Sequence, residues 1–542
     1  MARRGRDSAP ERSRPEAARP DLQAPARRGR DSAPERSRPE AARPDLQAPA
    51  RRGGDSAPER SRAEAARPDV RAPASLPRVL IAGLRGGSGK TLVTVGLVAA
   101  WRSQGRSVAV FKKGPDYIDA AWLTRAAGRP CRNLDLFLQP APVIVRSVLA
   151  QAAAADLVLI EGNRGLYDGL DAQGSCSTAE LAKLLGAPVI LVVDVTKSTR
   201  TTAALVLGCQ QLDRWVPIRG VILNRVSGSR HEAVARQAIQ DACDLPVLGA
   251  LPRLAEDPFP ERHLGLLPPQ EHAAAEPAVE RAASLASEYL DLAGIAELAA
   301  HAPQLHDRLP LAEPLATTVT ATPVRIGVFR DEAFQFYYPE NLEALTRAGA
   351  VLVEISPLRA ERLPSIDALY LGGGFPETFA PQLAANTTMR DSLRAAIGEG
   401  LPVYAECGGA VYLGERLEYE GSSYPMAGVL PASFTFSPRP RGHGYVVLET
   451  VAANPFFTPG EVLRGHEFHY TALAAAVAPD EFVFRVQRGY GFDGAHDGLC
   501  RGSVLASYTH LHALSSPAWA PALVQAARRF CTTAPTGAAV AD

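Results

Sequence analysis

A glycine-rich segment near residue 85 has the composition of a phosphate-binding loop. Residues 83–91 read Gly-Leu-Arg-Gly-Gly-Ser-Gly-Lys-Thr and lie between an apolar run, residues 79–82, and a helix-like stretch, residues 91–102. Glycines let backbone N–H groups wrap phosphate oxygens, and the positive end of the following helix adds to the attraction. Lys90 would reach the terminal phosphates, while the Thr91 hydroxyl would bind Mg²⁺. The segment therefore predicts nucleotide binding through Gly83, Gly86, Gly87, Ser88, Gly89, Lys90 and Thr91.

Acidic residues follow two further apolar runs, each typical of a buried strand. Asp116 comes after residues 108–111, and Glu161 comes directly after residues 157–160. In an open parallel sheet the carboxyl ends of neighbouring strands converge on one crevice. Mg²⁺ prefers a few hard oxygen ligands together with phosphates. Thr91, Asp116 and Glu161 are therefore predicted to bind one Mg²⁺, although both acids could instead cap helices or face solvent.

A cysteine flanked by glycines lies where a strand is expected to turn into a helix. Residues 403–409 read Val-Tyr-Ala-Glu-Cys-Gly-Gly, and such an elbow exposes a nucleophile whose thiolate the helix N-terminus would stabilise. Glycines at 372–374 could offer N–H donors to an oxyanion, and His510 could deprotonate the thiol. A free cysteine is more often an inert buried residue, but the three features together predict a nucleophilic site. Its members are Cys407, His510, Gly373, Gly374 and Gly408.

Apolar strand-like runs alternate with helical patterns in two series. The first begins at residue 78 and the second at residue 325, and residues 296–323 between them are rich in Pro, Thr, His and Ala. Buried apolar strands that alternate with helices indicate a doubly wound, mostly parallel sheet. We therefore predict an α/β P-loop domain, a linker, a second α/β domain and a short tail. Their expected ranges are 75–295, 296–322, 323–532 and 533–542.

The N-terminal part differs from the rest in composition. Residues 3–74 contain three tandem copies of a 24-residue unit rich in Arg, Pro, Ala, Asp and Glu, with almost no large apolar residues. Such a unit buries too little surface to offset the entropy of ordering it. We expect residues 1–74 to form a disordered arm without a catalytic role.

The bulk composition is that of a globular protein. The chain has 542 residues, 46% hydrophobic, with a formal net charge of zero, so no global basic field points to nucleic acid. Its apolar runs are too short to span a bilayer. Seven cysteines without Cys-x-x-Cys spacing, and no apolar signal-peptide core, favour the cytoplasm. Lysine supplies five of the 58 basic residues, which would mark positions that need a compact ammonium.

Several motifs of the first series resemble those of one enzyme family. They include Lys-Gly-Pro-Asp-Tyr-Ile-Asp at 113–119, Gly-Leu-Tyr-Asp-Gly at 165–169, Pro-Glu-Arg-His-Leu-Gly-Leu at 260–266, and the five-residue spacing from Gly83 to Gly89. This part is similar to the synthetase domain of the cobyrinate a,c-diamide synthase family. The second series, with Phe-Tyr-Tyr-Pro-Glu-Asn at 336–341 and Gly-His-Glu-Phe-His-Tyr at 465–470, resembles the class I glutamine amidotransferase domains of the same synthases. Together the resemblances span roughly residues 78–530.

The resemblance implies a carbon–nitrogen ligase that uses ATP, Mg²⁺ and L-glutamine. Ammonia from glutamine would amidate the a and c carboxylates of cobyrinate, a corrinoid of cobalamin biosynthesis, and the family is consistent with a homodimer. The chain departs from the family at Leu123, where many members have histidine, and from many amidotransferases at His512, which replaces the glutamate of His-x-Glu. Slow glutamine hydrolysis would be the expected consequence of the second change. The substrate contacts that the resemblance implies are Tyr117, Asp119, Tyr167 and Asp168.

Other functions fit parts of the same pattern. The same reaction could act on hydrogenobyrinate or nickel-sirohydrochlorin, because a macrocycle pocket discriminates by shape and a few contacts. A P-loop ATPase switch fused to an inactive glutaminase-like module would need no chemistry at Cys407. A metal site at His466, His469 and His512 has weak support, since no cysteine pair lies near them.

Overall fold

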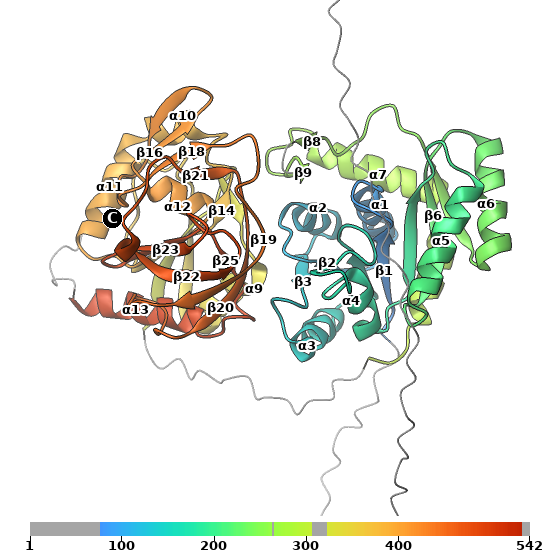
Figure 1. Cartoon of the computed structure of the whole chain (residues 1–542), viewed down its shortest axis with the longest axis horizontal. Coiled ribbons are helices and arrows are strands. Elements are labelled where there is room, and N and C mark those ends of the chain that lie inside the picture. Colours follow the sequence, from blue (N-terminus) through green and yellow to red (C-terminus); the bar gives the residue numbers. More distant parts are fainter. Residues whose placement is uncertain (1–75, 263–264, 306–321, 534–542) are drawn as a thin grey trace, which may run out of the picture. The chain divides into compact units, whose positions relative to one another are not determined.

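The computed structural model describes residues 76–262, 265–305 and 322–533 (Figure 1). All of them belong to one compact unit, Val70–Asp542. The predicted arm, residues 1–74, lies outside the described residues, as do the middle of the predicted linker and all but the first residue of the predicted tail.

The first domain is built on a seven-stranded parallel sheet. Its strand order is β3-β2-β4-β1-β5-β6-β7, and every neighbouring pair runs parallel. The central strand β1 pairs with β4 so that Ile81 lies opposite Glu161, which brings the ends of both strands to one edge. The strands are β1 Arg78–Gly83, β2 Val108–Lys113, β3 Arg132–Leu134, β4 Leu157–Glu161, β5 Val189–Asp194, β6 Ile218–Val226 and β7 Val247–Pro252.

Helices cover both faces of this sheet, so the doubly wound α/β prediction is confirmed. One hydrophobic core holds side chains of α1 Lys90–Ser103, α2 Ile118–Ala127, α7 Ala275–Tyr289 and α8 Leu292–Ala300. The other core holds those of α3 Ala141–Ala152, α4 Thr178–Leu185, α5 Arg200–Leu212 and α6 Ser229–Cys243. Helix α8 continues to Ala300, past the predicted domain end at residue 295, because Ile295 and Ala299 are buried in the first core. A short hairpin, β8 Glu261–Arg262 and β9 Gly265–Leu266, precedes α7.

The second domain contains a ten-stranded mixed sheet in the order β12-β10-β13-β15-β24-β23-β22-β19-β20-β25. From β12 to β24 the strands are parallel, and the remaining pairs are antiparallel. The parallel strands are β10 Val324–Phe329, β12 Ala350–Ile355, β13 Ala368–Leu371, β15 Val403–Glu406 and β24 Val504–Ser507. The antiparallel strands are β19 Gly442–Thr450, β20 Val462–His469, β22 Phe482–Arg488, β23 His496–Arg501 and β25 His510–Leu511.

Helices also cover both faces of the second sheet. Side chains of α10 Ala380–Ala385, α11 Thr387–Gly398 and α12 Gly408–Leu413 pack on one face, and those of α9 Pro339–Arg347 and α13 Trp519–Thr533 pack on the other. Two small sheets complete the domain. One pairs β11 Phe334–Phe336 with β14 Gly373–Gly374, and the other contains β16 Arg416–Tyr419, β17 Ser422–Pro425, β18 Ser433–Phe436 and β21 Thr471–Leu473.

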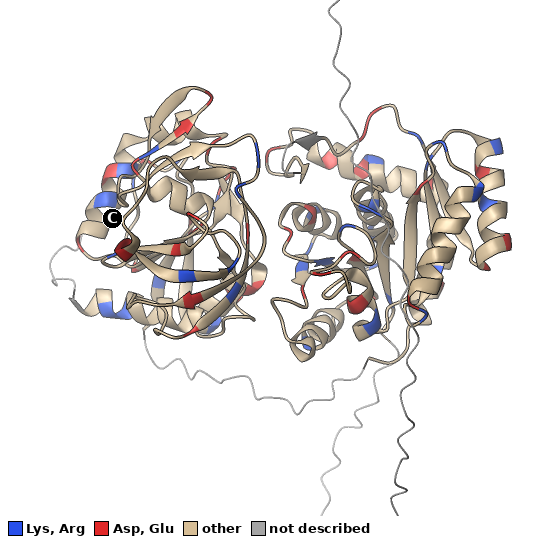
Figure 2. Ribbon diagram, in the orientation of Figure 1, with Lys and Arg blue, Asp and Glu red and all other residues tan. Residues whose placement is uncertain are grey.

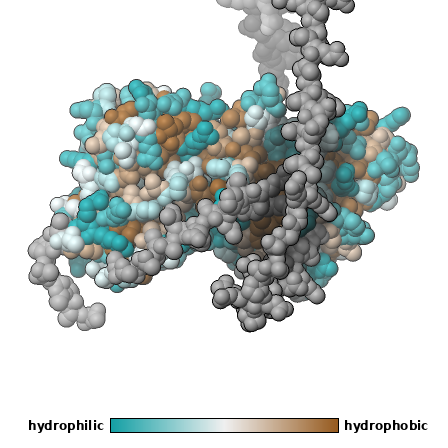
Figure 3. Space-filling model, turned by 90° about the horizontal axis from the view of Figure 1, so that it is seen from below, coloured by the Kyte–Doolittle hydropathy of each residue, from teal (hydrophilic) through white to brown (hydrophobic). Residues whose placement is uncertain are grey.

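Charged and apolar residues are mixed over the described part of the chain. Basic and acidic side chains are interspersed over the helices and loops (Figure 2). Hydrophilic and hydrophobic residues are likewise interspersed on the face seen in Figure 3 where grey atoms do not cover it. Among the described residues, no helix is both long enough and apolar enough to cross a membrane. All seven cysteines lie in the described ranges and are free.

The central strand β1 generates a stability prediction. Leu80 is fully buried there, whereas Leu212 at the end of α5 is 71% exposed. Leu80→Ala should lower the free energy of unfolding by about 2–5 kcal/mol, because it leaves a cavity between packed side chains. Leu212→Ala, the same chemical change at the surface, should alter it by less than about 0.5 kcal/mol. Urea unfolding of both variants tests this, and equal losses would contradict the placement of β1 in the core.

Candidate functional site

The glycine-rich loop joins β1 to α1 and curls around the Lys90 ammonium. Gly89 adopts a left-handed conformation, with φ 91°, immediately before the helix. The Lys90 Nζ donates to the carbonyl oxygens of Arg85, at 3.2 Å, and Arg164, at 2.9 Å. Burial and the nearby charge of Lys112 lower the pKa of Lys90. The predicted loop lysine therefore lies among loop carbonyls, next to the cavity described below.

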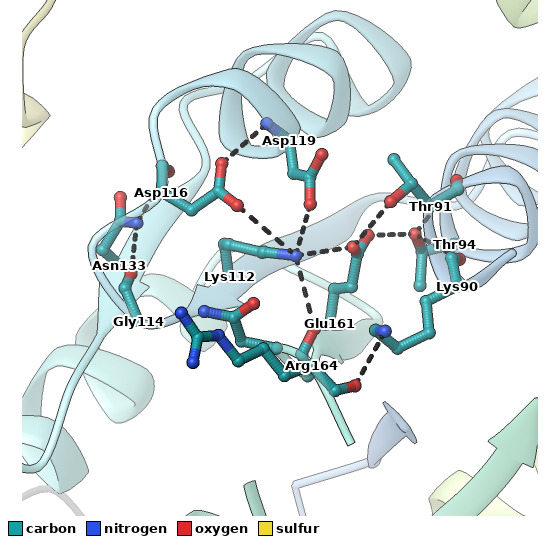
Figure 4. Close-up of polar contacts among 12 residues, drawn as sticks. Lys90, Thr91, Thr94, Lys112, Gly114, Asp116, Asp119, Asn133, Glu161 and Arg164 are labelled. Carbon is teal, nitrogen blue, oxygen red and sulfur yellow. Dashed lines mark hydrogen bonds and ion pairs between the residues drawn. The ribbon is translucent and has the colours of Figure 1, made fainter. Parts of the chain in front are cut away.

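A second lysine, Lys112 on β2, lies at the centre of the acidic residues (Figure 4). Its side chain is 1% exposed, and its Nζ is 2.6 Å from Asp119 Oδ2 and 2.7 Å from Glu161 Oε1. Asp116 Oδ2 lies 3.9 Å from the same nitrogen. Burial disfavours the ammonium, but these carboxylates outweigh it and raise the pKa of Lys112 well above its ordinary value. Lysine is scarce in the sequence, but no motif in it assigns Lys112 to the site.

The residues predicted to bind Mg²⁺ lie around this ammonium. Thr91 Oγ1 donates to Glu161 Oε1 at 2.9 Å, and Thr94 donates to the other oxygen of the same carboxylate. Burial and the charge of Asp119 raise the pKa of Asp116 to about 7. A hydroxyl and two carboxylates are the hard oxygen donors that Mg²⁺ takes beside phosphates, so the set fits that ion chemically. Within the described ranges, no group of three or more His, Cys, Asp or Glu residues has a metal-binding arrangement.

The four residues expected to contact substrate do not all meet at one place. Tyr117, Asp119 and Asp168 line the same cavity. Asp168 also accepts a hydrogen bond from the Gly165 N–H at 2.8 Å. Tyr167 instead lies against the core beneath α5, where its hydroxyl donates to the Cys209 carbonyl at 2.6 Å.

The predicted nucleophile Cys407 occupies a strained elbow between β15 and α12. Its backbone has φ 49° and ψ −106°, a conformation that costs about 1–3 kcal/mol and persists only where the surroundings enforce it. The N–H of Cys407 donates to the Ser507 carbonyl at 2.7 Å, which ties the elbow to β24. Burial raises the pKa of the Cys407 thiol, and this effect outweighs the hydrogen bond from the Gly408 N–H at the helix N-terminus, which acts in the opposite direction. Helix α12 has six residues, and the effect of burial on the thiol pKa is larger than that of the helix N-terminus.

The glycine segment 372–374 borders both the nucleophile elbow and the predicted base. A side chain at Gly373 would collide with the imidazole of His510, and a Cβ at Gly408 would lie 3.1 Å from the Gly374 nitrogen. His510 itself lies on β25, opposite His466 on β20, with the two rings stacked 4.9 Å apart. Gly373 therefore lies next to His510, and Gly374 lies next to Gly408 at the start of the helix after Cys407.

The second histidine of the motif, His512, faces away from this arrangement. Its Nε2 is 3.0 Å from the Gln139 side-chain nitrogen, and its ring packs 4.5 Å from that of Tyr338. Burial and the charge of Arg132 lower the pKa of His512 to about 3, so the ring is neutral.

One cavity of about 750 Å³ is lined by residues of both domains. Lys90, Thr91 and Asp116 reach it from the first domain, and Tyr445 and His510 from the second. The ring of Tyr117 lies between the two groups, stacked on Phe336 at 5.0 Å and 5.4 Å from the ring of His510. The nucleotide loop and the predicted glutaminase base therefore border the same space.

Comparisons with known proteins agree with this pair of domains. Residues 79–266 match the CobQ/CobB/MinD/ParA nucleotide binding domain, and residues 325–518 match the CobB/CobQ-like glutamine amidotransferase domain. A cobyrinate a,c-diamide synthase of Magnetococcus marinus is 44% identical over 452 residues, which are 83% of this chain and 97% of that protein. The chain belongs to the cobyrinate a,c-diamide synthase family.

Two further synthases of this family agree with the assignment. That of Methanothermobacter thermautotrophicus is 39% identical over 84% of this chain and 100% of its own length. That of Archaeoglobus fulgidus is 39% identical over 84% of this chain and 98% of its own. The predicted resemblance, and the predicted order of a P-loop domain followed by an amidotransferase domain, are confirmed.

The Lys112 cluster generates a prediction for this synthase. Lys112→Met leaves the buried carboxylate of Glu161 and the partly buried carboxylate of Asp119 without their ammonium, which should cost about 3–5 kcal/mol of stability. Lys183→Met is the matched control, because Lys183 forms ion pairs with the more exposed Glu180 and Asp213. Its loss should stay within about 1 kcal/mol. Chemical denaturation measures both, and a Lys112 effect no larger than that of Lys183 would contradict the buried cluster.

Proposed function

We propose that this chain amidates the a and c carboxylates of cobyrinate with glutamine-derived ammonia and ATP, as a step of cobalamin biosynthesis. Family membership supports the proposal, since the relatives carry that name over nearly their whole length. The observation that carries it is the shared cavity, where the nucleotide loop and His510 face one space. A binding switch with an inactive glutaminase module has no use for that arrangement.

The first half of the proposed reaction activates the acid. A carboxylate oxygen of the corrinoid attacks the γ-phosphorus of ATP, and the bond to the bridging oxygen breaks to give an acyl phosphate and ADP. Lys90 and the N–H groups of the loop bind the phosphates. Thr91, Asp116 and Glu161 would hold Mg²⁺, which neutralises phosphate charge when bound. Lys112 keeps Asp119 and Glu161 in position before the nucleotide arrives.

The second half releases ammonia. The sulfur of Cys407 attacks the side-chain amide carbon of glutamine while its proton passes to His510, which then protonates the leaving nitrogen. The N–H groups of the glycines at 373, 374 and 408 donate to the oxyanion. Ammonia leaves a thioester on Cys407, and water hydrolyses that thioester to glutamate and the free thiol.

Transfer of ammonia joins the two halves. Ammonia attacks the acyl carbon, phosphate leaves, and the amide forms, once for each of the two carboxylates. Ammonia that escaped to bulk water would be protonated and would lose its nucleophilic lone pair. His510 lines the shared cavity with Lys90 and Thr91, so ammonia released beside His510 would have a route that avoids this loss.

The two reactions belong to different parts of the chain. Residues 75–295 perform the synthetase step and residues 323–532 the glutaminase step, joined by a linker, while the arm at 1–74 has no catalytic role. Tyr117, Asp119 and Asp168 contact the corrinoid. Mg²⁺ dependence, a homodimeric state and a cytoplasmic location complete the proposal, the last supported by seven free cysteines.

Replacement of the nucleophile separates the two half-reactions. Cys407→Ser should abolish glutamine-dependent amidation, because a serine hydroxyl at this elbow is a much weaker nucleophile than the thiolate that His510 generates. Amidation of cobyrinate with ammonium chloride and ATP should stay near the wild-type rate. Chromatography of the corrinoid products, for the wild type and the variant with each nitrogen source, measures both rates. Loss of both activities would count against separate sites.

A further inference from the structure

The residue before the nucleophile, Glu406, has a buried carboxylate that lies beside the predicted base. Its side chain is 1% exposed, and its Oε2 is 3.6 Å from His510 Nδ1. Within the described residues, His510 Nδ1 is buried and makes no hydrogen bond. An unsatisfied buried nitrogen is costly, so a small rotation of the imidazole toward this oxygen would be favourable.

The other contacts of Glu406 leave one acceptor position open on the side of His510. Its Oε1 accepts from the Tyr404 hydroxyl at 3.2 Å and from the Leu511 N–H at 3.0 Å. Its Oε2 accepts from the Tyr370 hydroxyl at 3.0 Å. An ionised carboxylate offers about four lone-pair positions, two on each oxygen. The open position is therefore on Oε2, the oxygen that faces His510 Nδ1.

The backbone holds the acid and the base together. Glu406 ends β15 one residue before Cys407, and its Oε1 binds the N–H of the residue after His510. Glu406 also pairs with Ser507 on the neighbouring strand β24. One carboxylate thus contacts the strand that carries the nucleophile and the strand that carries the base.

We propose that Glu406 is the positioning carboxylate of a Cys407–His510–Glu406 triad. The inference rests on the proposed glutaminase function and deepens it. By accepting the Nδ1–H of His510, Glu406 fixes the tautomer whose Nε2 has a free lone pair, and that lone pair takes the Cys407 proton. The carboxylate also stabilises the imidazolium that forms on proton transfer. His512, a neutral ring packed against Tyr338 and Gln139, takes no part.

Glu406→Gln tests the tautomer. The two donors at Oε1 hold the amide oxygen on their side, so the amide N–H₂ replaces Oε2 and donates to His510 Nδ1. The proton of the neutral ring then lies on Nε2, which cannot accept the thiol proton. We expect kcat for glutamine hydrolysis to fall by about 10²- to 10⁴-fold, with KM for glutamine unchanged. Amidation driven by ammonium chloride should keep its wild-type rate.

Tyr404→Phe is the matched control. It removes a hydroxyl from Oε1 of the same carboxylate but leaves the charge that faces His510. We expect a loss of less than about tenfold in glutamine hydrolysis. If Glu406→Gln lies within about threefold of the wild type, or raises KM with kcat unchanged, the carboxylate does not position the base. An equal loss of ammonia-driven amidation would assign Glu406 a purely structural role.

A second measurement needs no variant of Glu406. In protein labelled with ¹⁵N-histidine, the imidazole resonances of His510 are assigned by comparison with His510→Gln. The proposal requires the Nδ1–H tautomer in the wild type at pH 8, and an Nε2–H tautomer would overturn it. A wild-type protein that hydrolyses no glutamine would instead refute the proposed function, so the two failures are distinguishable.

Discussion

Ammonia is a nucleophile only while it is unprotonated, and in neutral water most of it is ammonium. A synthase that makes ammonia at one site and consumes it at another must therefore connect the two sites through a space that excludes bulk water. Ion pairs and hydrogen bonds join the two domains, as this constraint requires. Arg132 of the first domain pairs with Glu340 of the second at 3.3 Å, and Tyr445 donates to Asp135. Tyr445 also lines the cavity, together with Lys90 and His510.

Both sites depend on a buried charge that neighbouring strands satisfy. On the synthetase side, Lys112 is held by acids that follow β2 and end β4. On the glutaminase side, Glu406 is held by hydroxyls from β13 and β15 and by an N–H from β25. Removing the charged group from such a cluster leaves its buried partners unsatisfied, whereas the complete cluster fixes its members in position. The sheets therefore position the reactive groups in two ways. They pack against these groups, and they supply the ion-pair and hydrogen-bond partners of the buried charges.

Much of this arrangement could be predicted from sequence because it depends on local patterns. The glycine loop and the cysteine elbow each have a spacing that only a strand–turn–helix segment fits. Thr91 and Glu161 could be expected to meet because parallel strands end at one edge of a sheet. In the structure Ile81 lies opposite Glu161, and the Thr91 hydroxyl donates to the Glu161 carboxylate. The alternation of apolar runs and helices predicted both α/β domains.

The rest depends on tertiary contacts that no local pattern reports. The direction of the Tyr167 side chain toward Cys209 is set by packing under α5, and α8 extends to Ala300 because its last turn is buried. The raised pKa of Cys407 reflects burial, which outweighs the short helix that the sequence indicates. Neither Lys112 nor Glu406 could be assigned its long-range partner, since Glu161 and Leu511 lie on strands whose order the sequence does not state.

Isotope competition tests the central claim, that ammonia passes between the sites without mixing with solvent. The wild-type protein is given cobyrinate, ATP and glutamine labelled with ¹⁵N in its amide, together with an excess of unlabelled ammonium. Mass spectrometry of the diamide product then reports the source of each new nitrogen. The shared cavity predicts ¹⁵N in both amides, largely undiluted by the external pool. A product whose label falls to the isotopic composition of the mixed pool would contradict the account.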